Sequence, residues 1–203
     1  MKYVIFANNA KLKEYKQLDV IGKFIYKEDV IVTCNHCLPM NYVFDKTECT
    51  TIWHISRCAF NTNIPYSGIN IIDAHKKIFS RIYCWPHPDV ISDQGNKKKT
   101  MDYLSQKTSF VTSDFSHMKG FSSHQTVKDV KAFLGARYNK NTNLSTGLAM
   151  YLYIKQNKDD DDKIYTVGFE HKMNLEKHNW EGERDYFKIE KEKGLCIPID
   201  LVL

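Results

Sequence analysis

The residues best suited to chemistry begin with a small polar turn, Ser145-Thr146-Gly147, which leads directly into the apolar run LAMYLYI. The first N–H groups of a helix have no intrahelical partner, and the helix dipole makes that end positive. A phosphate or carboxylate would fit against such a turn, and Gly147 would let it approach the backbone closely. The alternative is ordinary helix capping by the hydroxyl of Ser145 or Thr146.

A histidine in the stretch HNWEGERDYF (178–187) is a candidate general base. Imidazole side chains exchange protons near neutral pH, which is the property that general-base catalysis requires. Glu181 and Glu183 follow His178 closely enough along the chain to orient its ring. His178 could equally be an ordinary surface or core histidine, and three other histidines near predicted strand ends are competing bases: His36, His54 and His171.

Polar residues follow several of the predicted strands. Asn8 and Asn9 follow one apolar run, Asn35 follows the next, and Gly168 and Glu170 lie at the end of a later one. Ligands of parallel α/β sheets bind at the carboxyl ends of the strands. An Asn side chain offers both a donor and an acceptor, as recognition of a base or a sugar requires. Because Asn after a strand is also a common turn former, both interpretations stay open.

Two patterns that could suggest a metal site are weak. The CNHC stretch (34–37) has the spacing of half a zinc site, but the cysteines at 49, 58 and 84 form no second pair at ligand spacing. The run DDDD (159–162) fills the junction between a predicted helix and a predicted strand, which favours a solvated loop. No Asp-x-Asp pattern stands at a strand end to hold a metal-bound nucleotide diphosphate. We therefore expect no metal site.

The elements that must position these residues alternate between strands and helices. The patterns predict strands at 3–8, 29–35, 49–56, 82–86 and 163–169, and helices at 68–81, 123–138, 146–157 and 180–194, with Ser123 capping the second helix. The polar segment 11–19 also has helical character, and 195–203 predicts a strand or an extended tail. This alternation indicates an α/β, Rossmann-like fold with a mostly parallel sheet flanked by helices.

Length and composition set the limits. A chain of 203 residues that is 42% hydrophobic predicts a single domain over 1–203, with the polar segment 87–123 as a loop or lid. The net charge of +5 favours anionic partners. No window approaches the roughly 18 apolar residues of a membrane span, and the N-terminal apolar run is short. We therefore expect a cytoplasmic protein with reduced cysteines, whose membrane association would be peripheral, at the inner face.

Taken in order, these motifs resemble those of the sialyltransferases, both the bacterial lipooligosaccharide enzymes and the eukaryotic-type family. The resemblance lies in ANNAKLKE, DVIVTCNHC, STGLAMYLYI, IYTVGFE and the pair His178 and Glu183, and it covers residues 3–37 and 143–187. The family's sialylmotifs include a Ser-Thr-Gly-Leu helix start and a late His-x-x-x-x-Glu. The chain departs from the family in having Asn-Asn-Ala where Gly-Asn-Gly is usual, and in being shorter.

The resemblance implies a GT-A-variant glycosyltransferase that moves sialic acid from CMP-sialic acid to a glycan hydroxyl, with inversion and without a metal or other cofactor. In that case Asn9 and Asn35 would bind CMP, the Ser145–Gly147 turn would contact the nucleotide or the donor carboxylate, and His178 would deprotonate the acceptor. The partners would be a CMP-sugar donor and a glycan of lipooligosaccharide or capsule biosynthesis, with no nucleic acid. Two alternatives stay open: a CMP-Kdo-dependent glycosyltransferase, and a non-catalytic nucleotide- or nucleic-acid-binding module.

Overall fold

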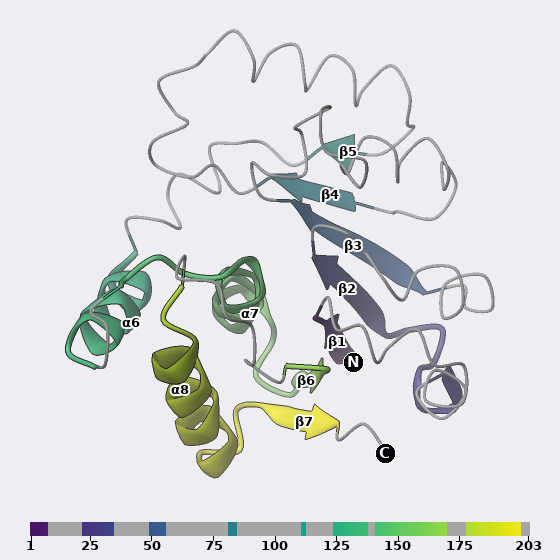
Figure 1. Ribbon diagram of the computed structural model, residues 1–203. Coiled ribbons are helices and arrows are strands. Elements are labelled where there is room, and N and C mark those ends of the chain that lie inside the picture. The colour runs from purple at the N-terminus through teal and green to yellow at the C-terminus, as the bar shows by residue number, and fades with distance from the viewer. Residues whose placement is uncertain are drawn as a thin grey trace, which may run out of the picture.

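The computed structural model has an α/β architecture in which helices pack against a parallel sheet (Figure 1). It describes residues 1–7, 22–34, 49–55, 81–84, 111–112, 124–137, 141–169 and 178–199. In this part of the chain the sheet has seven strands in the order β5-β4-β3-β2-β1-β6-β7. All neighbouring strands are parallel. The strands are β1 (Lys2–Phe6), β2 (Val30–Cys34), β3 (Thr50–Ile55), β4 (Arg81–Cys84), β5 (Val111–Thr112), β6 (Lys163–Val167) and β7 (Ile197–Ile199).

The two strands at the middle of the sheet have the composition expected of strands buried on both faces. In β1 the side chains of Val4, Ile5 and Phe6 are fully buried, and β2 is buried along its whole length. Strands of parallel sheets are covered on both faces and therefore read as near-continuous apolar runs rather than as alternating patterns. The sequences YVIF and VIVTC thus form the centre of the sheet.

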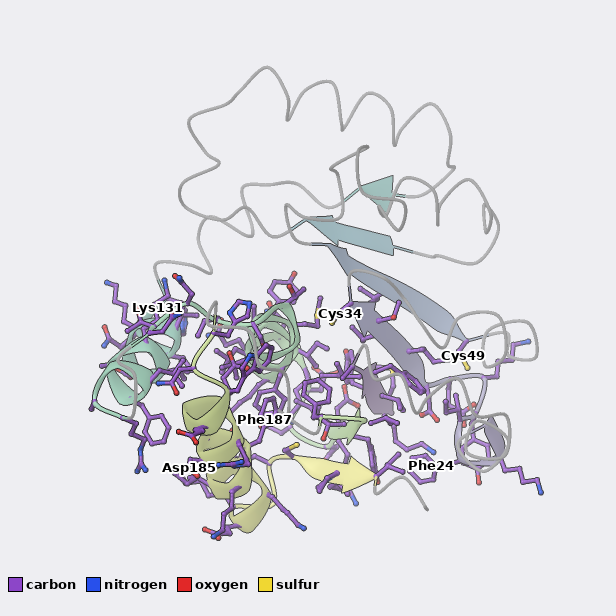
Figure 2. All side chains as sticks on the ribbon, in the orientation of Figure 1. Phe24, Cys34, Cys49, Lys131, Asp185 and Phe187 are labelled. Atoms are coloured by element: carbon purple, nitrogen blue, oxygen red, sulfur yellow. The ribbon has the colours of Figure 1, made fainter. Side chains whose placement is uncertain are left out.

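Three described helices lie on one face of the sheet: α6 (Gln125–Gly135), α7 (Thr146–Asn157) and α8 (Trp180–Glu192) (Figure 1). The middle helix, α7, packs on β1, β3 and β6, and it is apolar around most of its circumference. Its Tyr151 ring lies 5.0 Å from the ring of Phe187, which comes from α8 (Figure 2). Because α7 has the sheet on one side and α8 on the other, its sequence lacks a polar face.

The opposite face of the sheet carries a smaller described cluster around Phe24 (Figure 2). The Phe24 ring meets Tyr165 of β6 edge-on at 4.8 Å. The ammonium of Lys2 lies 4.1 Å from the Phe24 ring and 3.1 Å from the buried carboxylate of Asp29. Asp29 also accepts hydrogen bonds from the Lys2 and Tyr26 N–H groups, both at 2.9 Å. This cluster holds the start of β1 against the turn that leads into β2.

The structure corrects three of the element predictions. The N-cap of α6 is His124 rather than Ser123, and its side chain accepts a hydrogen bond from the Thr126 N–H. The predicted loop over 87–123 contains β5, and Arg81, expected at the end of a helix, begins β4. The rest of that predicted helix, residues 68–80, and the segment 11–19 lie outside the described residues.

Two further features concern the thiols and the helices. The cysteines at 34, 49 and 196 are buried free thiols. Among the described residues, no helix is long and apolar enough to cross a membrane.

Candidate functional site

The strand order reverses at the middle of the sheet. From β1 the chain adds β2, β3, β4 and β5 outward on one side, whereas β6 and β7 lie on the other side. In open parallel α/β sheets, ligands bind outside the carboxyl ends of the strands at such a reversal. Here β1 and β6 stay paired to their ends, where the Ala7 N–H donates to the Val167 carbonyl at 2.9 Å. The residues that follow β1 and β6 therefore border the expected ligand position.

Gly168 lies at this edge because it directly follows β6, and the ring of Phe169 packs against Gly147 near the same edge. Gly168 follows β6 with a φ of 75°, a conformation that glycine adopts without the strain that a Cβ would add. The next residue is Phe169, and a Cβ built on Gly147 would lie 2.8 Å from its Cε1 atom. The small size of Gly147 is therefore required for packing against Phe169. On the side where a Cβ would project, protein already fills the space that was expected to receive a ligand.

Ser145 is the N-cap of α7, as the capping alternative predicted. Its Oγ accepts a hydrogen bond from the Leu148 N–H at 3.2 Å, which satisfies one of the unpaired donors of the first turn. Ser145 is buried with only 6% of its surface exposed, an unusual position for a capping serine. Such burial requires that the remaining polar groups of Ser145 also find partners within the protein.

Glu183, in the first turn of α8, provides those partners. Its Oε1 accepts the Ser145 N–H at 2.7 Å, and its Oε2 accepts the Ser145 hydroxyl at 2.6 Å. The side chain is fully buried, and this burial raises the pKa of Glu183 to about 7, although the two donors of Ser145 oppose the rise. Burial therefore favours the protonated form of the Glu183 carboxyl more than in an exposed glutamate.

His178 lies immediately before the N-cap of α8 and is half-buried. Its Nδ1 is 3.0 Å from the carbonyl oxygen of Asn143, and its ring meets Trp180 edge-on at 5.1 Å. A carbonyl oxygen only accepts, so Nδ1 must carry the proton of this hydrogen bond. In the neutral ring the basic lone pair is then on Nε2.

This geometry corrects the expected pairing of His178 with Glu183. Asn143 orients the imidazole ring, both oxygens of Glu183 bind Ser145, and the alternative partner Glu181 is exposed. The reason is the helical position of Glu183. The buried stripe of α8 consists of Gly182, Glu183, Tyr186, Phe187 and Glu190, so Glu183 faces the core rather than the residue that precedes the helix.

Asn179 is a site-forming residue that the sequence analysis did not identify. It is the N-cap of α8, accepting the Gly182 N–H at 3.0 Å, and its exposed fraction is 1%. Its side-chain NH₂ donates to the carbonyls of Leu134 at 2.8 Å and Arg137 at 3.0 Å, at the end of α6. The starts of α7 and α8 and the end of α6 therefore meet at one junction. The capping pattern Asn-Trp-Glu-Gly was the available signal for this role.

A second buried carboxylate, Glu190, was also missed, and it lies at the other end of the same stripe. It forms an ion pair with Lys155 and accepts the Tyr151 hydroxyl at 2.7 Å. The pKa of Tyr151 is raised mainly by burial and, to a smaller extent, by the hydrogen bond to Glu190. This cluster joins α7 to α8 within the core. The signal for it was the spacing of Glu183, Tyr186, Phe187 and Glu190 on one helical face.

Several predicted site residues lie outside the described residues: Asn8, Asn9, Asn35, Glu170, His36 and His171. His54 belongs to β3, whose backbone alone is described at that position. In the described part of the chain, no group of three or more His, Cys, Asp and Glu side chains could hold a metal ion. The described part of the candidate site therefore consists of the Ser145–Gly147 turn, Gly168, His178 and Glu183.

Comparison of the chain with protein-family models, with curated proteins and with solved structures found no match.

Proposed function

We propose that the protein is an inverting, metal-independent glycosyltransferase that moves sialic acid from CMP-sialic acid to a glycan hydroxyl, in the cytoplasm or at the inner membrane face. The observation that supports this most is the contact between Ser145 and Glu183, which lie 38 residues apart. Ser145 opens the Ser-Thr-Gly-Leu motif and Glu183 closes the His-x-x-x-x-Glu motif. The segments that carry the resemblance are therefore in contact.

The strand order supports the same proposal. A parallel sheet with one reversal of strand order is the arrangement of doubly wound nucleotide-binding folds, and we assign this sheet to the Rossmann-like, GT-A-variant kind. The start of α7 reaches this reversal, because Gly147 packs against Phe169, which follows β6 by two residues. A nucleotide bound at the carboxyl ends of β1 and β6 would therefore be close to the Ser145–Gly147 turn.

The leaving group determines what the start of α7 would do. CMP departs as a phosphate monoester, and its developing negative charge needs hydrogen-bond donors or a cation. The Ser145 hydroxyl caps the Leu148 N–H, and the positive end of the α7 dipole would lie beside the phosphate. Burial raises the pKa of the neighbouring Glu183 to about 7, which weakens the repulsion between that carboxyl and the anion.

His178 would act on the acceptor. With its Nδ1 donating to the Asn143 carbonyl, the neutral ring has its basic nitrogen at Nε2, which in this proposal takes the proton of the attacking hydroxyl. Inversion needs only this one displacement, in which the acceptor oxygen bonds to the anomeric carbon as the bond to the CMP oxygen breaks. The proton passes to His178, and the charge passes to the phosphate of CMP.

The test is release of CMP from CMP-sialic acid in EDTA, with and without a glycan acceptor. A general base contributes roughly 10²- to 10⁴-fold, so His178→Ala should lower kcat by about that factor while donor affinity changes little. The pH–rate profile of His178→Ala should also lose its acidic limb.

His124→Ala is the matched control. It also removes a histidine, but the exposed ring of His124 contacts Gln156, at the end of α7 opposite Ser145. It should keep wild-type turnover. CMP-Kdo is tested in parallel as the rival donor. Failure to release CMP from either donor, or activity that appears only with Mg²⁺ or Mn²⁺, would overturn the proposal.

A further inference from the structure

The segment that leads into α7 is held at two successive peptide groups by side chains from the start of α8. The Asn143 carbonyl accepts from His178 at 3.0 Å, and the Ser145 N–H donates to Glu183 at 2.7 Å. These atoms belong to the peptide groups on either side of Leu144. Because peptide groups are planar, the φ and ψ angles of Leu144 alone set the angle between them.

Other contacts restrict those two angles. The side chain of Leu144 packs against the hydrophobic core, and Ser145 is fixed as the N-cap of α7. On the other side of the segment, the Asn143 N–H donates to the Asn141 Oδ1 at 2.9 Å. With the peptide group between Leu144 and Ser145 held by Glu183, the direction of the Asn143 carbonyl is determined.

We infer that Glu183 is a positioning residue for His178, acting through the backbone of Asn143–Ser145. By binding the N–H and hydroxyl of Ser145, Glu183 aims the Asn143 carbonyl at Nδ1 of His178, and this carbonyl selects the Nδ1–H tautomer of the neutral ring. The basic nitrogen is then Nε2. The inference rests on the proposed function for its catalytic meaning, whereas the tautomer is a property of the folded protein without substrate.

A purely structural role for Glu183 has a different consequence. If Glu183 only joined α8 to α7, removing it would lower stability, but His178 would keep its tautomer, because the Asn143 carbonyl would not move. The two roles therefore differ in the protonation pattern of one imidazole ring.

The experiment is ¹⁵N NMR of the full chain labelled at histidine, at a pH where the His178 ring is neutral, with His178→Gln used to assign its signals. In the wild type we expect the proton on Nδ1. In Glu183→Ala we expect a shift toward the Nε2–H tautomer. Glu183→Gln should keep Nδ1–H, because its amide can accept the Ser145 N–H and donate to the Ser145 hydroxyl.

Glu181→Ala is the matched control, because it removes an exposed carboxylate from the same turn of α8 and should leave the tautomer unchanged. If Glu183→Ala does not fold, Glu183→Leu, which retains buried volume but has no acceptor, replaces it. An Nε2–H tautomer in the wild type, or an unchanged Nδ1–H tautomer in a folded Glu183→Ala or Glu183→Leu protein, would overturn the inference.

Turnover gives an independent measurement. Glu183→Ala should lower kcat roughly 10- to 100-fold, part of the contribution of a general base, and Glu183→Gln should restore most of it. Absence of CMP release from the wild type would reject the proposed function and leave the tautomer result standing. A tautomer shift without any change in kcat would instead show that Glu183 does not act on catalysis through His178.

Discussion

At the scale of single residues, Glu183 makes stability depend on pH. Its pKa in the folded protein is about 7 because burial disfavours the charged form, whereas the ordinary value is 4.5. The folded state therefore binds the Glu183 proton more tightly than the unfolded state does. The stabilising contribution of the protonated carboxyl is fully present below about pH 4.5 and is lost as the pH rises through about 7.

Glu183→Gln should remove this dependence, because glutamine keeps the hydrogen-bonding shape and carries no charge. The unfolding free energy of the variant relative to the wild type should rise by up to about 3 kcal/mol between about pH 5 and about pH 8. Urea denaturation at a series of pH values measures this difference. Glu181→Gln controls for the loss of a carboxylate at an exposed position of the same turn. A difference no steeper than in the control would contradict the assigned burial effect.

At the scale of elements, the junction of three helices depends on Asn179. Its buried side chain satisfies one N–H of α8 and two carbonyls at the end of α6, of which the Arg137 carbonyl is partly buried. Asn179→Ala should therefore lower the free energy of unfolding by roughly 2–4 kcal/mol, as loss of a cap that leaves buried groups unpaired does. Chemical denaturation followed by circular dichroism measures the loss.

Asn157→Ala is the matched control for Asn179→Ala. Asn157 is exposed at the end of α7, and its side chain donates to the Tyr153 carbonyl. We expect its replacement to change the free energy by less than about 0.5 kcal/mol. Equal losses in the two variants would show that the junction contributes nothing beyond ordinary capping.

The helix α7 was predictable because its signals are local. A serine cap followed by an unbroken apolar run predicts a helix over 146–157, and the structure has Thr146–Asn157. The strand β5 was not predictable from local pattern. Val111 and Thr112 form a strand by pairing with Arg81 and Ile82. The sequence around them is mostly polar and gives no sign of that pairing.

The same division applies to the candidate site. The Ser145 cap follows from neighbouring residues, whereas its contact with Glu183 depends on how α8 packs on α7. Sequence proximity predicted that Glu183 orients the His178 ring, whereas the helix geometry directs both of its oxygens to Ser145. The placement of Glu183 in line with Phe187 on the buried stripe of α8 is the feature from which a buried carboxylate can be inferred.

At the scale of the whole molecule, the reversal between β1 and β6 predicts which ligand should stabilise the fold. If the carboxyl ends of β1 and β6 bind CMP, adding CMP at about 100 times its dissociation constant should raise the unfolding free energy by about 2.7 kcal/mol. AMP and UDP at the same concentration should shift the melting temperature much less. Differential scanning fluorimetry measures all three, and equal shifts would indicate a generic anion site rather than a CMP site.

The central position of β1 also has a consequence for synthesis of the protein. During translation β1 emerges before β2, which can pair with it once Cys34 has left the ribosome, whereas β6 emerges only with Lys163–Val167. Until then, one side of β1 presents the unpaired backbone groups of an apolar strand edge, which is a template for pairing with other chains. The risk of aggregation through β1 is therefore greatest during translation. A chain halted before Lys163 would be prone to aggregate through an edge that the finished protein never exposes.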